Sequence, residues 1–123
     1  MALVLTESEL KKQRGDEKIV RETAAQVIKD FAMFGMEVAF PENIHWAYDE
    51  LFEQLNRHIG YLLGANDKML LSLLYQIDVS EKSIRKGVES NAGNSLSEVV
   101  TSLVLERELK KVITRNYFKE QGT

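Results

Sequence analysis

Glu42 and His45 are the two residues of this sequence whose side chains and spacing most resemble those of a metal site. A Glu-x-x-His spacing places a carboxylate and an imidazole on one helical turn, but di-iron bundles need a second such pair and further glutamates. The other histidine, His58, has Leu55 three residues before it, and roughly 20 Å of helix axis separates the two histidines. We therefore predict no metal ligand and no cofactor.

The serines and carboxylates do not form a recognisable catalytic group. Most serines occur where helix caps and loops need them, and the sequence has neither a Gly-x-Ser-x-Gly elbow nor a phosphate-binding glycine loop. Asp49, Glu50, Glu53 and Arg57 have the spacing of a solvated helix face. A carboxylate pair that acts as acid and base stays open, because sequence does not reveal burial. We expect a protein that is not an enzyme, without catalytic residues.

The stretch LLYQIDVSEKSIRKG, residues 73–87, has a pattern found in DNA-binding helix-turn-helix motifs. If Asp78 occupies the turn, the apolar residues on both sides fall where the two helices must pack. Lys82, Arg85 and Lys86 then face outward toward a major groove. A nucleic-acid-binding regulator that uses residues 70–88 is therefore the alternative function.

Three residues of this stretch depart from the helix-turn-helix pattern. Leu74 is bulky where the helices must approach closely, and Gly87 stands where a further core residue belongs. Asp78 would need a left-handed backbone, which aspartate tolerates less readily than glycine. We therefore interpret the stretch first as a corner between two packed helices, capped by Ser80 or by Asp78 with Glu81.

The last predicted helix, Ser95 to about Lys119, carries apolar residues on two faces. Its second half has an apolar face about half a turn away from that of the first half. We call this face the distal stripe; it consists of Leu105, Leu109, Val112 and Ile113. One straight helix cannot bury both faces against the same neighbour, so it is either sandwiched or packs its distal half on something else.

Trp46 lies off the apolar stripe of the helix predicted for residues 43–63. It is either covered by the N-terminal arm ALVLTESEL or exposed, and exposed tryptophan often marks an interface. We predict that Trp46 and the distal stripe contact another protein or a second copy of the chain, as in a homodimer.

The composition predicts an all-α protein. Abundant Leu, Ala, Glu, Lys and Gln with a single Pro are typical of helices, and no segment alternates as a half-buried strand does. We expect a compact bundle of about five helices with a long C-terminal helix, after residues 1–15 as a short helix or loose arm. After this arm, we expect a helix that begins at the N-cap Asp16 and ends at Pro41. The helix at 43–63 should end at Gly64 as its C-cap, and Asn66 or Asp67 should be the N-cap of the helix KMLLSLLYQI. A capping box from Ser95 to Glu98 should begin the last helix.

Length and charge exclude several classes of protein. A chain of 123 residues that is 44% hydrophobic can bury one core, so we expect a single helical domain over residues 1–123. The absence of cysteine excludes disulfides and thiolate metal sites. The opening MALVL followed by TESEL is neither a secretory signal nor a membrane span, so we expect a cytoplasmic protein without a membrane partner. The formal net charge of −3 means that any nucleic-acid contact has to be local.

Two segments, LLYQIDVSEKSI and EVVTSLVLERELKKVITRNYF, together resemble a recurrent ending in small uncharacterised bacterial helical proteins. Those proteins carry an LLYxIDVSE segment followed by a Leu/Ile-rich C-terminal helix of the ERELKKV type. The similarity covers about Leu70 to Phe118. It implies a bacterial origin and a helical unit in which the two segments belong together; it implies no activity and no functional residue.

Overall fold

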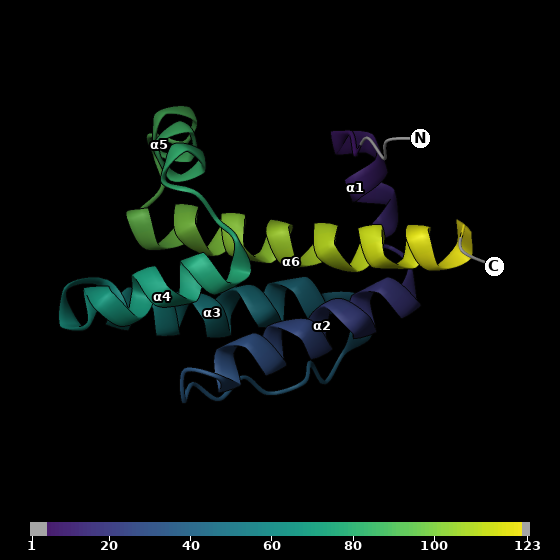
Figure 1. The fold of residues 1–123 in the computed structure, drawn as a ribbon, viewed down its shortest axis with the longest axis horizontal. Helices are drawn as coiled ribbons and strands as arrows, with labels where there is room; N and C mark the ends of the chain where they lie inside the picture. The colour runs from purple at the N-terminus through teal and green to yellow at the C-terminus, as the bar shows by residue number, and fades with distance from the viewer. Residues whose placement is uncertain (1–4, 122–123) are drawn as a thin grey trace.

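The computed structural model describes residues 5–121, and this part of the chain is an all-α bundle without a strand (Figure 1). The predicted fold class and the long C-terminal helix are confirmed. A short helix occupies part of the segment predicted as a helix or arm. The elements are α1 (Glu7–Gln13), α2 (Glu17–Ala32), the 3₁₀ turn η1 (Ile44–Trp46), α3 (Ala47–Ala65), α4 (Asp67–Ile77), α5 (Glu81–Ser90) and α6 (Leu96–Gln121).

The long helix α6 is the element around which the bundle is built. Figure 1 shows α2, α3 and α4 along one side of α6, with α1 and α5 on the other side. Its most extensive contacts are with α2 and α3, and α5 packs on it as well. Helix α6 is thus sandwiched, which is the first of the two arrangements that its two apolar faces allow.

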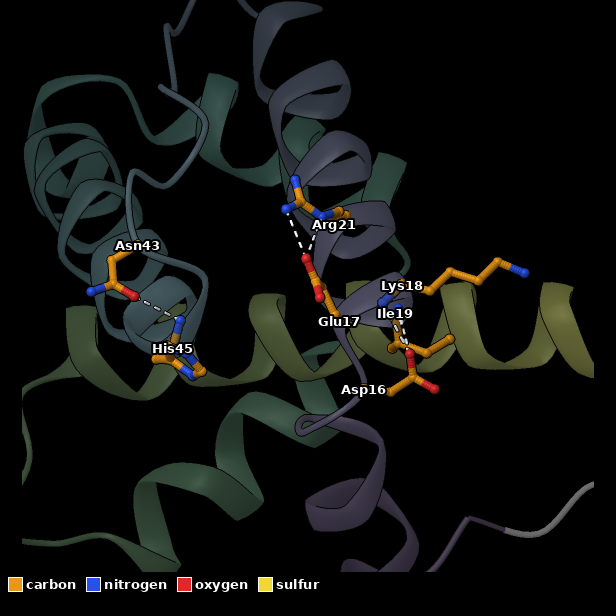
Figure 2. Close-up of polar contacts among 7 residues, drawn as sticks. All are labelled: Asp16, Glu17, Lys18, Ile19, Arg21, Asn43 and His45. Atoms are coloured by element: carbon orange, nitrogen blue, oxygen red, sulfur yellow. Dashed lines mark hydrogen bonds and ion pairs between the residues drawn. The ribbon is translucent and has the colours of Figure 1, made fainter.

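Short polar side chains begin the helices where the sequence predicts them. Asp16 Oδ1 accepts hydrogen bonds from the backbone N–H groups of Lys18 and Ile19 at 2.9 and 3.3 Å (Figure 2). The hydroxyl of Ser80 accepts from the N–H of Ser83 at 3.1 Å. The first N–H groups of a helix have no partner within the helix, so these oxygens fix where α2 and α5 start.

The capping box at the start of α6 is formed in both directions. The N–H of Ser95 donates to Glu98 Oε1 at 2.9 Å, and the N–H of Glu98 donates to Ser95 Oγ at 3.1 Å. Hydrogen bonds from Ser95, through its backbone first and then its hydroxyl, lower the pKa of Glu98 below the usual range of a glutamate. The predicted box is confirmed.

The prediction that the helix after Asp16 runs to Pro41 is wrong. Helix α2 ends at Ala32, and Gly35 takes a left-handed φ of +74°. The N–H of Met36 then returns to the carbonyl of Phe31 at 3.1 Å, which closes the helix end. Residues 36–40 continue outside any helix.

Side chains of α3 hold this non-helical segment by its backbone. Gln54 pairs with both polar groups of Ala39: the N–H donates to Gln54 Oε1 at 2.8 Å, and Gln54 Nε2 donates to the carbonyl at 3.0 Å. His58 Nε2 donates to the carbonyl of Glu37 at 2.8 Å. Glu37 and Ala39 are exposed, so these three hydrogen bonds serve to hold the segment against α3, which gives Gln54 and His58 a structural role.

The apolar side chains form two cores along α6. The main core joins α2, α3, α4 and the first half of α6, and it includes Phe31, Leu55, Leu73 and Val104, none of which is exposed. The second core lies at the far half of α6. It consists of Leu10, Ile19, Leu109, Val112 and Ile113.

The distal stripe lies inside the protein, which corrects the prediction that it forms a contact surface. Its exposed fractions are 9% for Leu105, 1% for Leu109, 0% for Val112 and 5% for Ile113. Leu105 belongs to the main core, while α1 places Leu10 against the other three side chains and α2 adds Ile19. In this fold the four side chains are therefore not available to a partner.

Candidate functional site

Trp46 is the residue of the predicted contact surface that lies on the outside. It ends the turn η1, and 61% of its surface is exposed. The same turn contains His45, whose N–H is capped by Asn43 Oδ1 at 2.9 Å (Figure 2). A contact made by Trp46 therefore stays a prediction, whereas the distal stripe is corrected.

The corner around Asp78 contains the left-handed residue that a helix-turn-helix turn would need. Asp78 is left-handed, with φ 73° and ψ 51°. Its N–H and that of Val79 both donate to the carbonyl of Leu74 at 2.9 Å, which closes α4. This bonding is also the common C-terminal cap of an ordinary helix, so it does not identify a DNA-binding motif by itself.

The packing of α5 differs from that of a recognition helix. A helix-turn-helix needs its two helices packed on each other. Helix α5 packs mainly on α6 instead, and α4 is not among the helices with which it has extensive contact; Figure 1 shows α4 and α5 on different sides of α6. Lys82, Arg85 and Lys86 are exposed on α5, so a nucleic-acid contact made by them stays a prediction, which the packing of α5 does not support.

Gly87 allows α5 to pack closely on α6. A Cβ atom at Gly87 would lie 2.8 Å from Val99 Cγ1 and 3.4 Å from Leu103 Cδ1. The missing side chain lets the backbone of α5 approach α6 more closely than any other residue would allow. The glycine that departs from the helix-turn-helix pattern is thus the residue that docks α5 elsewhere.

An apolar groove lies where α4, α5 and the start of α6 meet. This open groove has a volume of about 300 Å³ and is lined by Leu63, Leu70, Leu71, Leu74, Ile84, Leu96 and Val100 together with Glu81 and Arg85. Leu71 is 58% exposed and Leu96 is 47% exposed. Tyr75, one helical turn from Leu71, is 88% exposed and extends the same face of α4. Exposed contiguous apolar surface of this kind commonly marks an interaction site.

Two opposite charges lie at the edge of this groove. Glu81 and Arg85 are one turn apart on α5, and both are exposed. Within residues 5–121 neither of them forms an ion pair. The groove therefore offers one acidic and one basic side chain to whatever covers it.

A second unusual cluster lies in the interior between α2 and α6. The side chain of Glu108 is fully buried, and Asp30 is 4% exposed. Lys111 Nζ lies 3.1 Å from Glu108 Oε1 and 3.9 Å from Asp30 Oδ2. Burial, and then the neighbouring Asp30 carboxyl group, raise the pKa of Glu108 to about 8, against a smaller opposing effect of Lys111.

Sequence reasoning left a carboxylate pair open but did not identify this one. The available signal was a charged residue at an apolar position in each helix. Glu108 stands three and four residues from Leu105 and Val112 in the distal stripe, and Asp30 lies between Val27 and Phe31 on the buried face of α2. Charged residues are rarely fully buried unless they are paired, so the two positions together predict a contact.

The carboxyl pair is buried, and none of its residues lines the groove. Among residues 5–121, no group of three or more His, Cys, Asp or Glu side chains is placed to hold a metal ion. Within the same residues, no helix has both the length and the apolar character needed to cross a bilayer. Comparisons with protein-family models, curated proteins and solved structures found no match to this chain.

Proposed function

We propose that this chain is a non-enzymatic protein that acts by protein-protein contact, and that its partner is a second copy docked groove to groove. The observation that carries the proposal is the apolar groove with the exposed Leu71, Leu96 and Tyr75 along it. Covering a large apolar side chain contributes about 1.5–3 kcal/mol, so several such residues supply a driving force for association.

The charges at the groove edge support a second copy as the occupant. A two-fold axis that crosses α5 between Glu81 and Arg85 places Glu81 of one copy against Arg85 of the other, and the reverse. Both charges, which are unpaired within the described part of one chain, then gain a partner. Charge pairs at the edge of an interface set its orientation, and like charges placed against each other there oppose association.

Sedimentation velocity over a range from micromolar to millimolar protein tests the apolar part of this proposal. The wild-type chain is expected to associate as its concentration rises, and Leu71→Lys is expected to remain a monomer because the lysine must be desolvated in the groove. Met33→Lys is the matched control, since Met33 is 57% exposed and lies outside the groove. A wild-type chain that stays monomeric throughout would overturn the proposal.

Charge reversal tests the two-fold arrangement. Glu81→Arg alone places arginine against arginine across the axis, and Arg85→Glu alone places glutamate against glutamate, so each is expected to weaken association. The double variant restores opposite pairs and is expected to associate like the wild type. Association that survives both single reversals, or that the double variant does not recover, contradicts a groove-to-groove dimer.

A further inference from the structure

We infer that Asp30, Glu108 and Lys111 form a proton-binding site at the contact between α2 and α6, and that this contact loosens when the proton leaves. The site is separate from the groove, and its residues come from two helices whose contact is among the most extensive in the bundle. The fold would thereby respond to pH at an interior position.

The net charge of the cluster favours the binding of one proton. Two carboxylates and one ammonium group carry a net charge of −1, whereas one added proton makes the cluster neutral. Glu108 is fully buried and Asp30 nearly so, and transfer of an uncompensated charge into a protein interior is strongly unfavourable. The folded chain therefore favours the form in which the pair keeps one proton.

The hydrogen bonding of the cluster also favours the protonated form. Within residues 5–121, neither oxygen of Glu108 accepts a hydrogen bond of good geometry, and the same holds for Asp30 Oδ2. A proton on one carboxyl group supplies an O–H donor to the other. Protonation therefore adds a hydrogen bond between the two carboxyl groups, beside the ion pair of Glu108 Oε1 with Lys111 Nζ. Two interacting carboxyl groups titrate as a pair, and the retained proton belongs to both.

The charged groups around Glu108 come from α2 and α6. Asp30 is the charge from α2, and its Oδ1 accepts from the amide of Gln26 at 3.1 Å. From α6 come Lys111 and, one turn further, Arg115, whose guanidinium donates to Gln26 Oε1 at 3.0 Å. Besides burial, the raised pKa of Glu108 comes from Asp30 and is opposed by Lys111, so α3 and α4 contribute no charge to it.

The direction of the pH effect follows from proton linkage. A glutamate side chain has an ordinary pKa of 4.5, whereas Glu108 in the folded chain has a pKa of about 8. Between these values the folded chain holds one more proton than the unfolded chain, so stability falls as pH rises. The contribution is fully present below the ordinary value and is lost once pH has risen through the folded value.

Urea unfolding from about pH 5 to about pH 9 tests this inference. The equilibrium constant for unfolding of the wild type is expected to rise by up to about tenfold per pH unit in this window. Glu108→Gln, a neutral side chain of the same shape, is expected to remove most of that dependence. Glu106→Gln is the control, because Glu106 lies on the same helix and pairs with Lys110 outside the cluster. It is expected to keep the wild-type profile.

A carbon-13 NMR titration of the glutamate side chains of the wild type gives a second readout that does not need the variant to fold. One glutamate carboxyl group is expected to titrate far above the ordinary range. The inference is overturned if all glutamates titrate in their ordinary range. It is equally overturned if Glu108→Gln folds and keeps the pH dependence of the wild type.

Discussion

Gly87 brings the backbone of α5 tightly against Val99 and Leu103 of α6, and a substitution there tests how firmly α5 is held. Alanine at this position would place its Cβ 2.8 Å from Val99 Cγ1. Valine on a helix has a restricted χ1, so this methyl group cannot easily turn away. We expect Gly87→Ala to lower the free energy of unfolding by about 1–3 kcal/mol in urea denaturation, although alanine favours helix over glycine.

Gly93 is a suitable control for that measurement. It lies in the loop between α5 and α6, and a Cβ atom there would meet nothing within 4 Å. Gly93→Ala is expected to change stability by less than about 0.5 kcal/mol. If Gly87→Ala were as stable as the wild type, α5 would not be held at this close approach.

At the scale of residues, the sequence indicates which positions are unusual, but it does not indicate what role each of them has in the fold. In the sequence, Gly87 and Asp78 depart from the helix-turn-helix pattern; in the structure, Gly87 permits close packing and Asp78 forms a left-handed cap. The pair Asp30 and Glu108 was not identified, because burial of each side chain depends on which helices pack together. That information lies in contacts far apart in the sequence.

At the scale of elements, helix starts were predicted well because their signals are local. The capping residues Asp16, Ser80 and Ser95 each act on N–H groups within three residues of themselves. The end of α2 was misplaced because apolar residues continue at helical spacing past Gly35. Val38 is indeed buried, but from a segment that has left the helix.

The start of α6 allows a direct test of one such local signal. Ser95→Ala removes the hydroxyl that accepts from the N–H of Glu98, so we expect a loss of about 1 kcal/mol in the free energy of unfolding. Ser72→Ala in the exposed middle of α4 is the control, where alanine should be neutral or slightly stabilising. Equal stability of the two variants would show that the capping box does not contribute to the fold.

At the scale of the whole molecule, the division of the interior into two cores explains why the distal stripe was misinterpreted. Its apolar face points away from that of the first half of α6, as the sequence indicates, but the second partner is the chain's own α1. That helix has seven residues, and Leu10 is its buried residue. Isolated helices of this length are not stable in water, so α1 depends on that contact.

The two cores should therefore differ in how easily they open. Leu10→Ala removes most of the side chain that α1 buries on Leu109, Val112 and Ile113. We expect amide hydrogen exchange of residues 7–13 to accelerate strongly, while α3 and α4 keep their protection, because the main core does not include α1. Lys11→Ala, at an exposed position of the same helix, should leave the exchange pattern unchanged. A uniform loss of protection through all helices in Leu10→Ala would instead show that both cores unfold as one unit, with α6 transmitting the loss from one end of the bundle to the other.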